Sequence, residues 1–159
     1  MAPSWSITIT ATGIGKNLEI DLSEYKYATY VNGKINLGAG ALTLNSIADG
    51  RNPQGFSVSL NAANTHAGGT VLTNYAAVRL GNAGALGSGG LTLCPNTVLD
   101  LNTFSVTIPW LRGAGGMITD TNGAVGVSTL TVNQSMDTTY AGVINNGPVR
   151  SIALFKKGV

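Results

Sequence analysis

The sequence predicts an all-β fold and, within that class, a right-handed parallel β-helix of about six or seven coils, on three observations. Apolar and polar residues alternate in short runs along the whole chain, Gly, Asn or Asp follows each run, and similar phrases recur. Period-two alternation buries one face of a strand, and these turn residues tolerate positive φ. No segment shows a convincing helical period, so the chain is expected to contain strands and turns alone.

The expected core consists of the apolar residues in the alternating runs. The runs are Trp5/Ile7/Ile9, Leu18/Ile20/Leu22, Ile35/Leu37, Leu42/Leu44, Phe56/Val58/Leu60, Val78/Leu80, Leu91/Leu93, Leu99/Leu101, Phe104/Val106/Ile108, Leu130/Val132 and Ile152/Leu154. Asparagines that follow strands are expected to mark turns, where their side chains bond local backbone or stack in ladders. Examples are Asn45, Asn61 and Asn133.

Internal similarity favours a solenoid over a sandwich or a barrel. Segments 57–70 (SVSLNAANTHAGGT) and 128–142 (STLTVNQSMDTTYAG) share a strand, an Asn, a small-residue turn and a Thr-His/Tyr-x-Gly ending. Segments 38–46, 87–96 and 113–123 repeat the combination of strand and Gly-rich turn. Repetition of one phrase indicates units that stack on their neighbours, whereas a sandwich needs hairpins and varied strands.

The amino-acid composition argues against several classes of protein. Charged residues make up 10% of the chain, Gly accounts for 22 residues, and the net charge is +2, which is too small to predict nucleic-acid binding. Cys94 is the single cysteine, so an intrachain disulfide and a Cys-based metal site are excluded, and the residue is expected to be half-buried before Pro95. No apolar run reaches the length of a membrane helix. We expect an extracellular or cell-surface location and a mature segment with an added start codon, because the first residues lack signal-peptide features.

The phrase at 57–70 resembles the autotransporter-associated β-strand repeat, whose pattern is roughly L-T-L-x-G-x-N-T-Y-x-G-G-T. His66 stands where that family usually has Tyr, and the matching residues are Leu60, Asn64, Thr65, Gly68, Gly69 and Thr70. Segments 82–93, 98–102 and 107–144 resemble the following stretch, and 154–159 (LFKKGV) resembles the lead-in to another repeat. The resemblance implies a parallel β-helix, secretion and display at a bacterial surface, and it implies no reaction.

The chain is expected to form one structural domain with two parts. Residues 1–34 are a divergent N-terminal coil or cap, and residues 35–159 are the repeats, uncapped at their C-terminal end. Open solenoid ends present unpaired strand edges. Acidic residues (Glu19, Asp21, Glu24) and basic residues (Arg150, Lys156, Lys157) gather toward opposite ends, which predicts a head-to-tail homo-oligomer or filament, weakened by salt.

The candidate surface for ligands or self-association combines acidic, aromatic and basic residues. Glu19 and Asp21 share one strand face, which favours a solvated outer surface over general acid/base work of the glycosidase kind. The tyrosines are expected to cap the first coil, with stacking on surface glycans as the alternative, and Trp110 is expected to pack over a corner. The members are Tyr25, Tyr27, Tyr30, Trp110, Glu19, Asp21, Lys156 and Lys157.

No catalytic, metal or cofactor site is expected. His66 is the only histidine, no nucleophile elbow accompanies it, and it is interpreted as structural. Asp100 and Asp120 lie beside turn residues without a calcium-loop series. We therefore expect a structural or adhesive segment (stalk, adhesin or filament subunit) that is not an enzyme, does not insert in a membrane and binds no nucleic acid. A carbohydrate-binding module and a β-helical polysaccharide-degrading enzyme are the alternatives.

Overall fold

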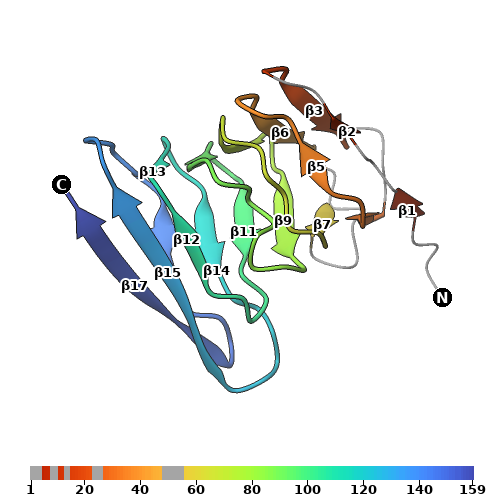
Figure 1. The fold of residues 1–159 in the computed structure, drawn as a ribbon. Coiled ribbons are helices and arrows are strands. Elements are labelled where there is room, and N and C mark those ends of the chain that lie inside the picture. Colours follow the sequence, from red (N-terminus) through yellow and green to blue (C-terminus); the bar gives the residue numbers. More distant parts are fainter. Residues whose placement is uncertain (1–4, 8–10, 13–14, 23–26, 48–55) are drawn as a thin grey trace.

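The computed structural model describes residues 5–7, 11–12, 15–22, 27–47 and 56–159, and the side chains from residue 15 onward within these ranges. These residues form strands and turns and contain no helix. The thirteen strand pairings among the described residues are all parallel. The strands stack along one axis, with β1 to β3 at one end and β17 at the other (Figure 1). The chain is therefore a parallel β-solenoid, which confirms the predicted fold class.

Two sheets form the main walls of the solenoid. The first has seven strands in the order β1 (Trp5–Ile7), β4 (Thr29–Val31), β7 (Val58–Leu60), β9 (Ala77–Leu80), β11 (Val98–Asp100), β14 (Met117–Thr119) and β16 (Val143–Ile144). The second has five strands in the order β13 (Leu111–Arg112), β10 (Leu91–Leu93), β8 (Thr70–Thr73), β6 (Leu42–Asn45) and β3 (Leu18–Asp21). Strands from distant parts of the sequence thus become neighbours, as a crossover connection between parallel strands requires.

Two smaller sheets complete the cross-section. β2 (Ala11–Thr12) pairs with β5 (Ile35–Asn36), and β15 (Gly126–Gln134) lies between β12 (Val106–Ile108) and β17 (Arg150–Gly158). β15 and β17 are nine residues long and pair in register over their whole length. They form a long ribbon at the C-terminal end of the solenoid (Figure 1).

The solenoid makes about five turns, slightly fewer than the six or seven that we expected. The coils also differ in length. Asn32 and Asn61 stack in adjacent coils although they are 29 residues apart, whereas Asn102 and Asn122 are 20 residues apart. The longer coils therefore use more of the chain than a uniform repeat would.

Aliphatic side chains stack in columns inside the rod. One column follows the register from Val58 through Val78 and Leu99 to Ile118, and all four side chains are at most 1% exposed. Each fully buried aliphatic side chain contributes roughly 1.5–3 kcal/mol, so these columns supply most of the cohesion between coils. The buried members of the predicted core are Ile20, Leu22, Ile35, Leu37, Leu42, Leu44, Phe56, Val58, Leu60, Val78, Leu80, Leu91, Leu93, Leu99, Leu101, Val106, Ile108, Leu130 and Val132.

The other residues predicted to lie in the core are partly buried, exposed or outside the described residues. Leu18, Phe104 and Ile152 are partly buried against the core. Leu154 is 53% exposed and the prediction for it is wrong, because β17 is the last strand of its sheet and no described strand covers it. The side chains of Trp5 and Ile7, and all of Ile9, lie outside the described residues.

Asparagine ladders connect successive coils at the turns. Nδ2 of Asn61 donates to Oδ1 of Asn32 at 2.7 Å, Asn74 donates to Asn45 at 2.9 Å, and Asn122 donates to Asn102 at 3.1 Å. Asn45 ends β6 and Asn61 follows β7, as expected of turn residues. Asn133 lies inside β15, so the turn prediction is wrong there, because the strand continues beyond the end of β12 to Gln134 and pairs there with β17.

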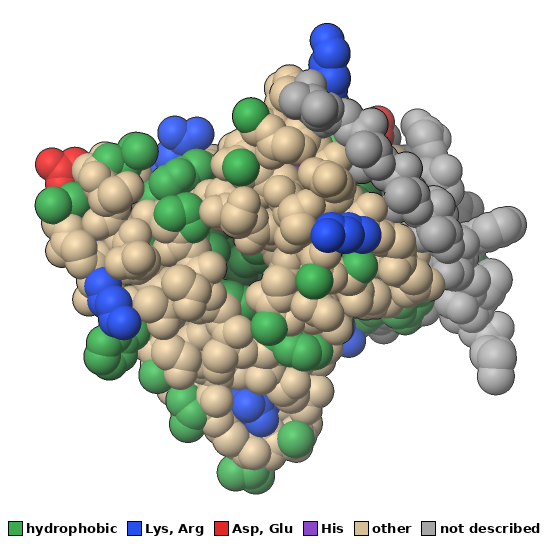
Figure 2. Space-filling model, in the orientation of Figure 1, with side chains coloured by type: hydrophobic (Ala, Val, Ile, Leu, Met, Phe, Trp, Pro, Cys, Tyr) green, Lys and Arg blue, Asp and Glu red, His purple; other side chains and the backbone are tan. Residues whose placement is uncertain are grey.

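The surface is polar with little charge. On the face in Figure 2, uncharged polar side chains and backbone dominate and the charged side chains are isolated. Within the described ranges, none of the secondary structure is a helix with the length and apolar character that a membrane span requires.

Candidate functional site

The two acidic candidates lie on β3, the edge strand of the five-stranded sheet. Glu19 and Asp21 are exposed, and they alternate with Leu18 and Ile20, which face the core. Oδ1 of Asp21 accepts a hydrogen bond from Nδ2 of Asn45 at 3.4 Å. This pair of carboxylates therefore lies on the outer wall of the first coils, as the alternation predicted.

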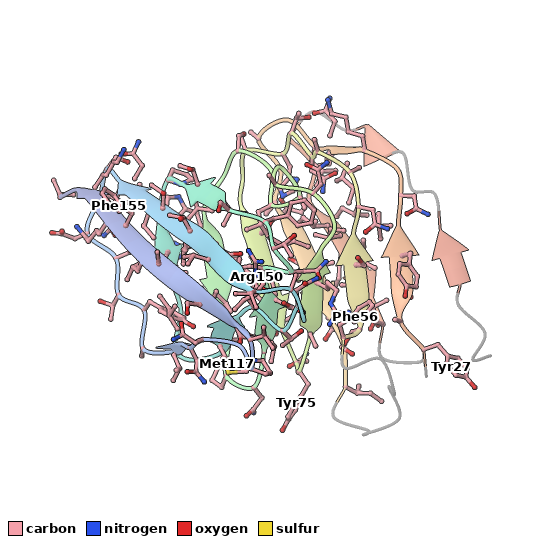
Figure 3. All side chains as sticks on the ribbon, turned by 90° about the horizontal axis from the view of Figure 1, so that it is seen from below. Tyr27, Phe56, Tyr75, Met117, Arg150 and Phe155 are labelled. Carbon is pink, nitrogen blue, oxygen red and sulfur yellow. The ribbon has the colours of Figure 1, made fainter. Side chains whose placement is uncertain are left out.

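The tyrosine candidates separate in the structure. Tyr25 lies outside the described residues. Tyr30 on β4 packs edge-on against Phe56, with ring centroids 5.9 Å apart and planes at 86°. Phe56 in turn lies under the guanidinium of Arg79, at 4.2 Å from its Cζ. Tyr27 is half-buried and its side chain projects away from the strands (Figure 3), so Tyr27 and Tyr30 do not form one continuous aromatic row.

Trp110 packs against a glycine surface between coils, in keeping with its predicted corner position. A Cβ at Gly90 would overlap the ring, and a Cβ at Gly69 would lie 3.1 Å from it, tighter than an ordinary contact. The guanidinium of Arg112 lies over the indole, 4.5 Å from the ring centroid, and its Nε donates to Thr92. The Gly-Gly pairs of the repeat thus provide the flat contact that a large aromatic ring needs.

Two aspartates, Asp100 and Asp120, organise the turns after β11 and β14. Asp100 accepts from Nε of Arg79 at 2.9 Å and from the hydroxyl of Thr121 at 2.5 Å. Its second oxygen accepts from the backbone N–H groups of Asn102 and Thr121. The carboxylate is therefore fully engaged in holding two coils together.

Asp120 lies one coil further along the solenoid. It also accepts several hydrogen bonds and pairs with an arginine, and it is more deeply buried than Asp100. Its Oδ2 accepts from Ser128 at 2.5 Å, from the backbone N–H of Thr103 at 3.0 Å and from Nε of Arg150 at 3.2 Å, and the Asp120 side chain is 0% exposed. The guanidinium of Arg150 also donates to two backbone carbonyls, those of Ala124 and Val125. Arg150 points inward from β17 (Figure 3). This ion pair fastens the last strand to the preceding coil.

Sequence reasoning missed both ion pairs because the arginines lie far from the aspartates in the chain. Arg79 and Asp100 are 21 residues apart, and Asp120 and Arg150 are 30 residues apart. One signal was present: Asp-x-Asn occurs at 100–102 and again at 120–122, at a spacing of one coil. Recurrence at the coil spacing predicts a stacked turn, although it does not reveal which cation pairs with it.

His66 is buried between coils and has a defined tautomer. Thr70 donates its only hydroxyl proton to the carbonyl of Leu86 at 2.9 Å, so Nε2 of His66, 2.8 Å away, must donate to Thr70. Nδ1 of His66 is then an unprotonated acceptor without a hydrogen-bond partner. Burial lowers the pKa of His66 below its usual 6.5. The residue is 0% exposed, in agreement with its structural interpretation.

The C-terminal end of the solenoid carries an open apolar cleft of about 180 Å³. Tyr140 forms part of its wall, and burial raises the pKa of this phenol to about 12. Lys156 lies at its rim, and its Nζ donates to the carbonyl of Val159. The lining residues are Leu111, Val132, Gln134, Thr138, Tyr140, Ile144, Leu154 and Lys156.

The remaining candidates do not form one cluster. Lys157 is exposed on β17, with its ammonium 5.8 Å from the ring of Phe155, and Cys94 is half-buried at the end of β10. Across the part of the chain that the structure describes, no three His, Cys, Asp or Glu side chains are grouped as metal ligands. The acidic candidates lie at one end of the rod and the basic ones at the other (Figure 1).

The fold defines the class of protein to which the chain belongs, a parallel β-solenoid. Comparisons with protein families, with characterised proteins and with solved structures find no match to this chain.

Proposed function

We propose that the chain is a structural and adhesive β-helical segment of a secreted bacterial surface protein, serving as a stalk, adhesin or filament subunit and not as an enzyme. The observation that carries this proposal is the unbroken parallel register, which runs through seven strands of one wall. Such stacking makes a stiff rod, because each coil is held to the next by backbone ladders and a shared core. The resemblance of 57–70 to the autotransporter-associated repeat supports a cell-surface location.

Several structural features favour a mechanical role for the polar residues. The two buried aspartates each use their hydrogen-bonding capacity to join coils, and the asparagine ladders do the same at the turns. The outer surface carries few charges, as is suitable for a fibre that contacts a substratum through hydrogen bonds and shape (Figure 2).

The experiment is display of the 159-residue chain on the surface of a non-adherent bacterium. We expect the displaying cells to adhere to glass, plastic or matrix-coated surfaces more than cells with the display anchor alone. Substitution of Asn64 by Ala, which removes an inter-coil bridge, should reduce adhesion in step with the loss of folded protein. Adhesion equal to that of the anchor alone would contradict the proposal.

Binding of surface glycans is the second candidate, favoured by one observation. Tyr75 is 47% exposed and holds a positive φ of 64°, a strained conformation for an aromatic residue, and it projects from the same side of the molecule as Tyr27 (Figure 3). Exposed tyrosine rings can stack on sugars. Affinity electrophoresis in neutral and acidic polysaccharides tests this, and Tyr75→Ala together with Tyr27→Ala should abolish any retardation.

A further inference from the structure

The beginning of β15 carries an exposed apolar surface. Val125, which immediately precedes the strand, is 88% exposed, more than any other large apolar side chain in the described part of the chain, and Val127 is 58% exposed. Val149 is 45% exposed and immediately precedes β17, and the register of the two strands, continued back by one residue, places it opposite Val125. We call these three valines the aliphatic tip.

The aliphatic tip lies at the side of the rod. β15 is an interior strand of its sheet, between β12 and β17. Residues 126–129 of β15 precede the pairing with β12, which begins at Leu130, and this end of the ribbon projects beyond the neighbouring strands (Figure 1). Val125 and Val127 are therefore exposed because the ribbon projects, although β17 already continues the stack beside them.

Polar contacts hold the backbone of the aliphatic tip in place. Nη1 of Arg150 donates to the carbonyl of Ala124 at 3.1 Å and to that of Val125 at 3.5 Å. Oδ1 of Asn122 accepts from the N–H of Ala124 at 2.9 Å. A Cβ at Gly126 would lie 2.6 Å from the guanidinium, so only glycine leaves room for Arg150 here. The valines are thus presented on a fixed backbone, which lowers the entropy cost of making a contact.

The surroundings of the aliphatic tip are uncharged in sequence. Segments 121–129 and 145–149 contain no Asp, Glu, Lys or Arg. The charged residues that flank them, Asp120 and Arg150, pair with each other, and their side chains are 0% and 10% exposed. An apolar surface placed against the tip therefore removes little charge from water, which would otherwise oppose the contact. Single exposed apolar residues are ordinary, whereas neighbouring ones on an uncharged projection indicate a contact site.

We propose that the aliphatic tip is the adhesive contact of the chain and that its partner is an extended apolar surface, such as a waxy or hydrocarbon-coated solid. The size of the tip decides the kind of partner. Three valine side chains fall far short of the roughly 1,200 Å² that a specific protein–protein interface buries, and Trp, Tyr and Arg dominate the binding energy of such interfaces. An extended surface is contacted by many chains at once, so weak single contacts add up to firm adhesion. The inference rests on the proposed adhesive role and names its substratum.

Adhesion of displaying bacteria to alkyl-coated glass and to bare glass tests the contact. The variant carries Val125→Thr and Val127→Thr, which keep the β-branched shape and strand propensity and replace one methyl group of each valine by a hydroxyl. After subtraction of cells with the anchor alone, we expect wild-type cells to bind alkyl-coated glass in preference to bare glass. The variant should bind alkyl-coated glass at least about tenfold more weakly, because each chain loses two buried methyl groups.

Val143→Thr is the matched control, since Val143 is 57% exposed and lies on β16 in another sheet, and it should leave adhesion unchanged. Circular dichroism melting of the purified chains shows whether each variant is folded. Equal binding of the folded double variant and the wild type to alkyl-coated glass would overturn the inference, and so would an equal loss for Val143→Thr. Capture by phosphatidylcholine vesicles without binding to alkyl-coated glass would overturn it in favour of a lipid membrane.

The failure of this inference can be distinguished from the failure of the proposed function. Wild-type cells that adhere equally to bare and alkyl-coated glass would remove the role of the aliphatic tip and leave the adhesive rod in place. Adhesion equal to that of the anchor alone on every surface would contradict the adhesive rod itself.

Discussion

Nε of Arg150 lies 3.2 Å from Oδ2 of Asp120. Asp120 occupies an inward position that aliphatic side chains occupy in earlier coils. In the earlier coils this column consists of Val31, Leu60 and Leu80, which are paired in register. The pairings of the next strands, continued by one residue past Asp100, align Leu80 with Leu101 and Leu101 with Asp120. A charged pair therefore replaces the aliphatic core where the last coil joins the solenoid. Such a pair is strongly destabilising when one partner is removed, since the other charge remains buried.

Substitution of Arg150 by Ala should therefore reduce the free energy of unfolding by about 3–5 kcal/mol. The reason is the carboxylate of Asp120, which would be left 0% exposed without its cation. Arg79→Ala is the comparison, because 29% of the Arg79 side chain is exposed and water can replace it beside Asp100. Urea or guanidinium denaturation measures both losses. A loss for Arg150→Ala no larger than that for Arg79→Ala would show that the buried pair does not fasten β17.

Asn64 is a second bridge between coils, and its removal should be costly. Its Oδ1 accepts from the backbone N–H of Ile35 in one neighbouring coil at 2.8 Å, and its Nδ2 donates to the carbonyl of Ala85 in the other at 2.7 Å. Asn64→Ala leaves both backbone groups without these partners in the buried interior, so we expect a loss of about 2 kcal/mol or more. Asn61→Ala removes the ladder contact to Asn32 and the hydrogen bond that Oδ1 accepts from the Ser59 hydroxyl, but no bridge to buried backbone. It should cost about 1 kcal/mol, less than Asn64→Ala. Equal losses in denaturant titrations would contradict the bridging role.

The stability of the chain should fall in mild acid because of His66. Burial lowers the pKa of His66 below 6.5, so the unfolded chain takes up the proton first as the pH falls. The contribution is complete above about pH 6.5 and is lost as the pH falls below that value toward the folded pKa, with a slope of at most about 1.4 kcal/mol per pH unit. Unfolding titrations between pH 7.5 and 5 measure this slope. His66→Gln, which retains a donor for Thr70 but does not titrate, should have a smaller slope, and an unchanged slope would assign the acid sensitivity to other groups.

The contact between Gly90 and Trp110 predicts a coupled pair of substitutions. A Cβ at position 90 would overlap the indole ring, so Gly90→Ala should destabilise the chain by about 1–3 kcal/mol. In the background of Trp110→Leu the same change should cost less, because the obstructing ring is absent. Gly123→Ala is the matched control, since a Cβ there meets nothing within 4 Å. A double-mutant cycle on denaturation free energies checks the coupling, and additive losses would show that the ring does not rest on Gly90.

The alternating runs and repeated phrases were sufficient to predict the class of fold, because period-two burial and stacking are local properties. Leu44 and Leu93, for example, occupy the buried positions that alternation assigns them. The coil count was less accurate, because the sequence does not reveal how many turn residues each coil accommodates. Leu154 was assigned to the core since alternation cannot indicate that a strand ends its sheet.

The contacts between coils were predicted less well, for a physical reason. Arg150 and Asp120 meet only because β17 stacks on β15, and the register of that pairing depends on the whole intervening chain. Asn61, by contrast, was correctly placed at a turn from its position after a strand. Features set by neighbours in sequence can be predicted, whereas charge pairing across coils requires the register.

The stacking of coils in one register is the central claim, and a distance between two spin labels tests it most directly. Glu19 and Arg112 occupy one outward column and are separated by four coil steps. With Cys94→Ser as background, labels on Glu19→Cys and Arg112→Cys should give a narrow distance distribution near 19 Å, from about 4.8 Å per step. A broad distribution, or one centred far from this value, would contradict the stacked parallel solenoid.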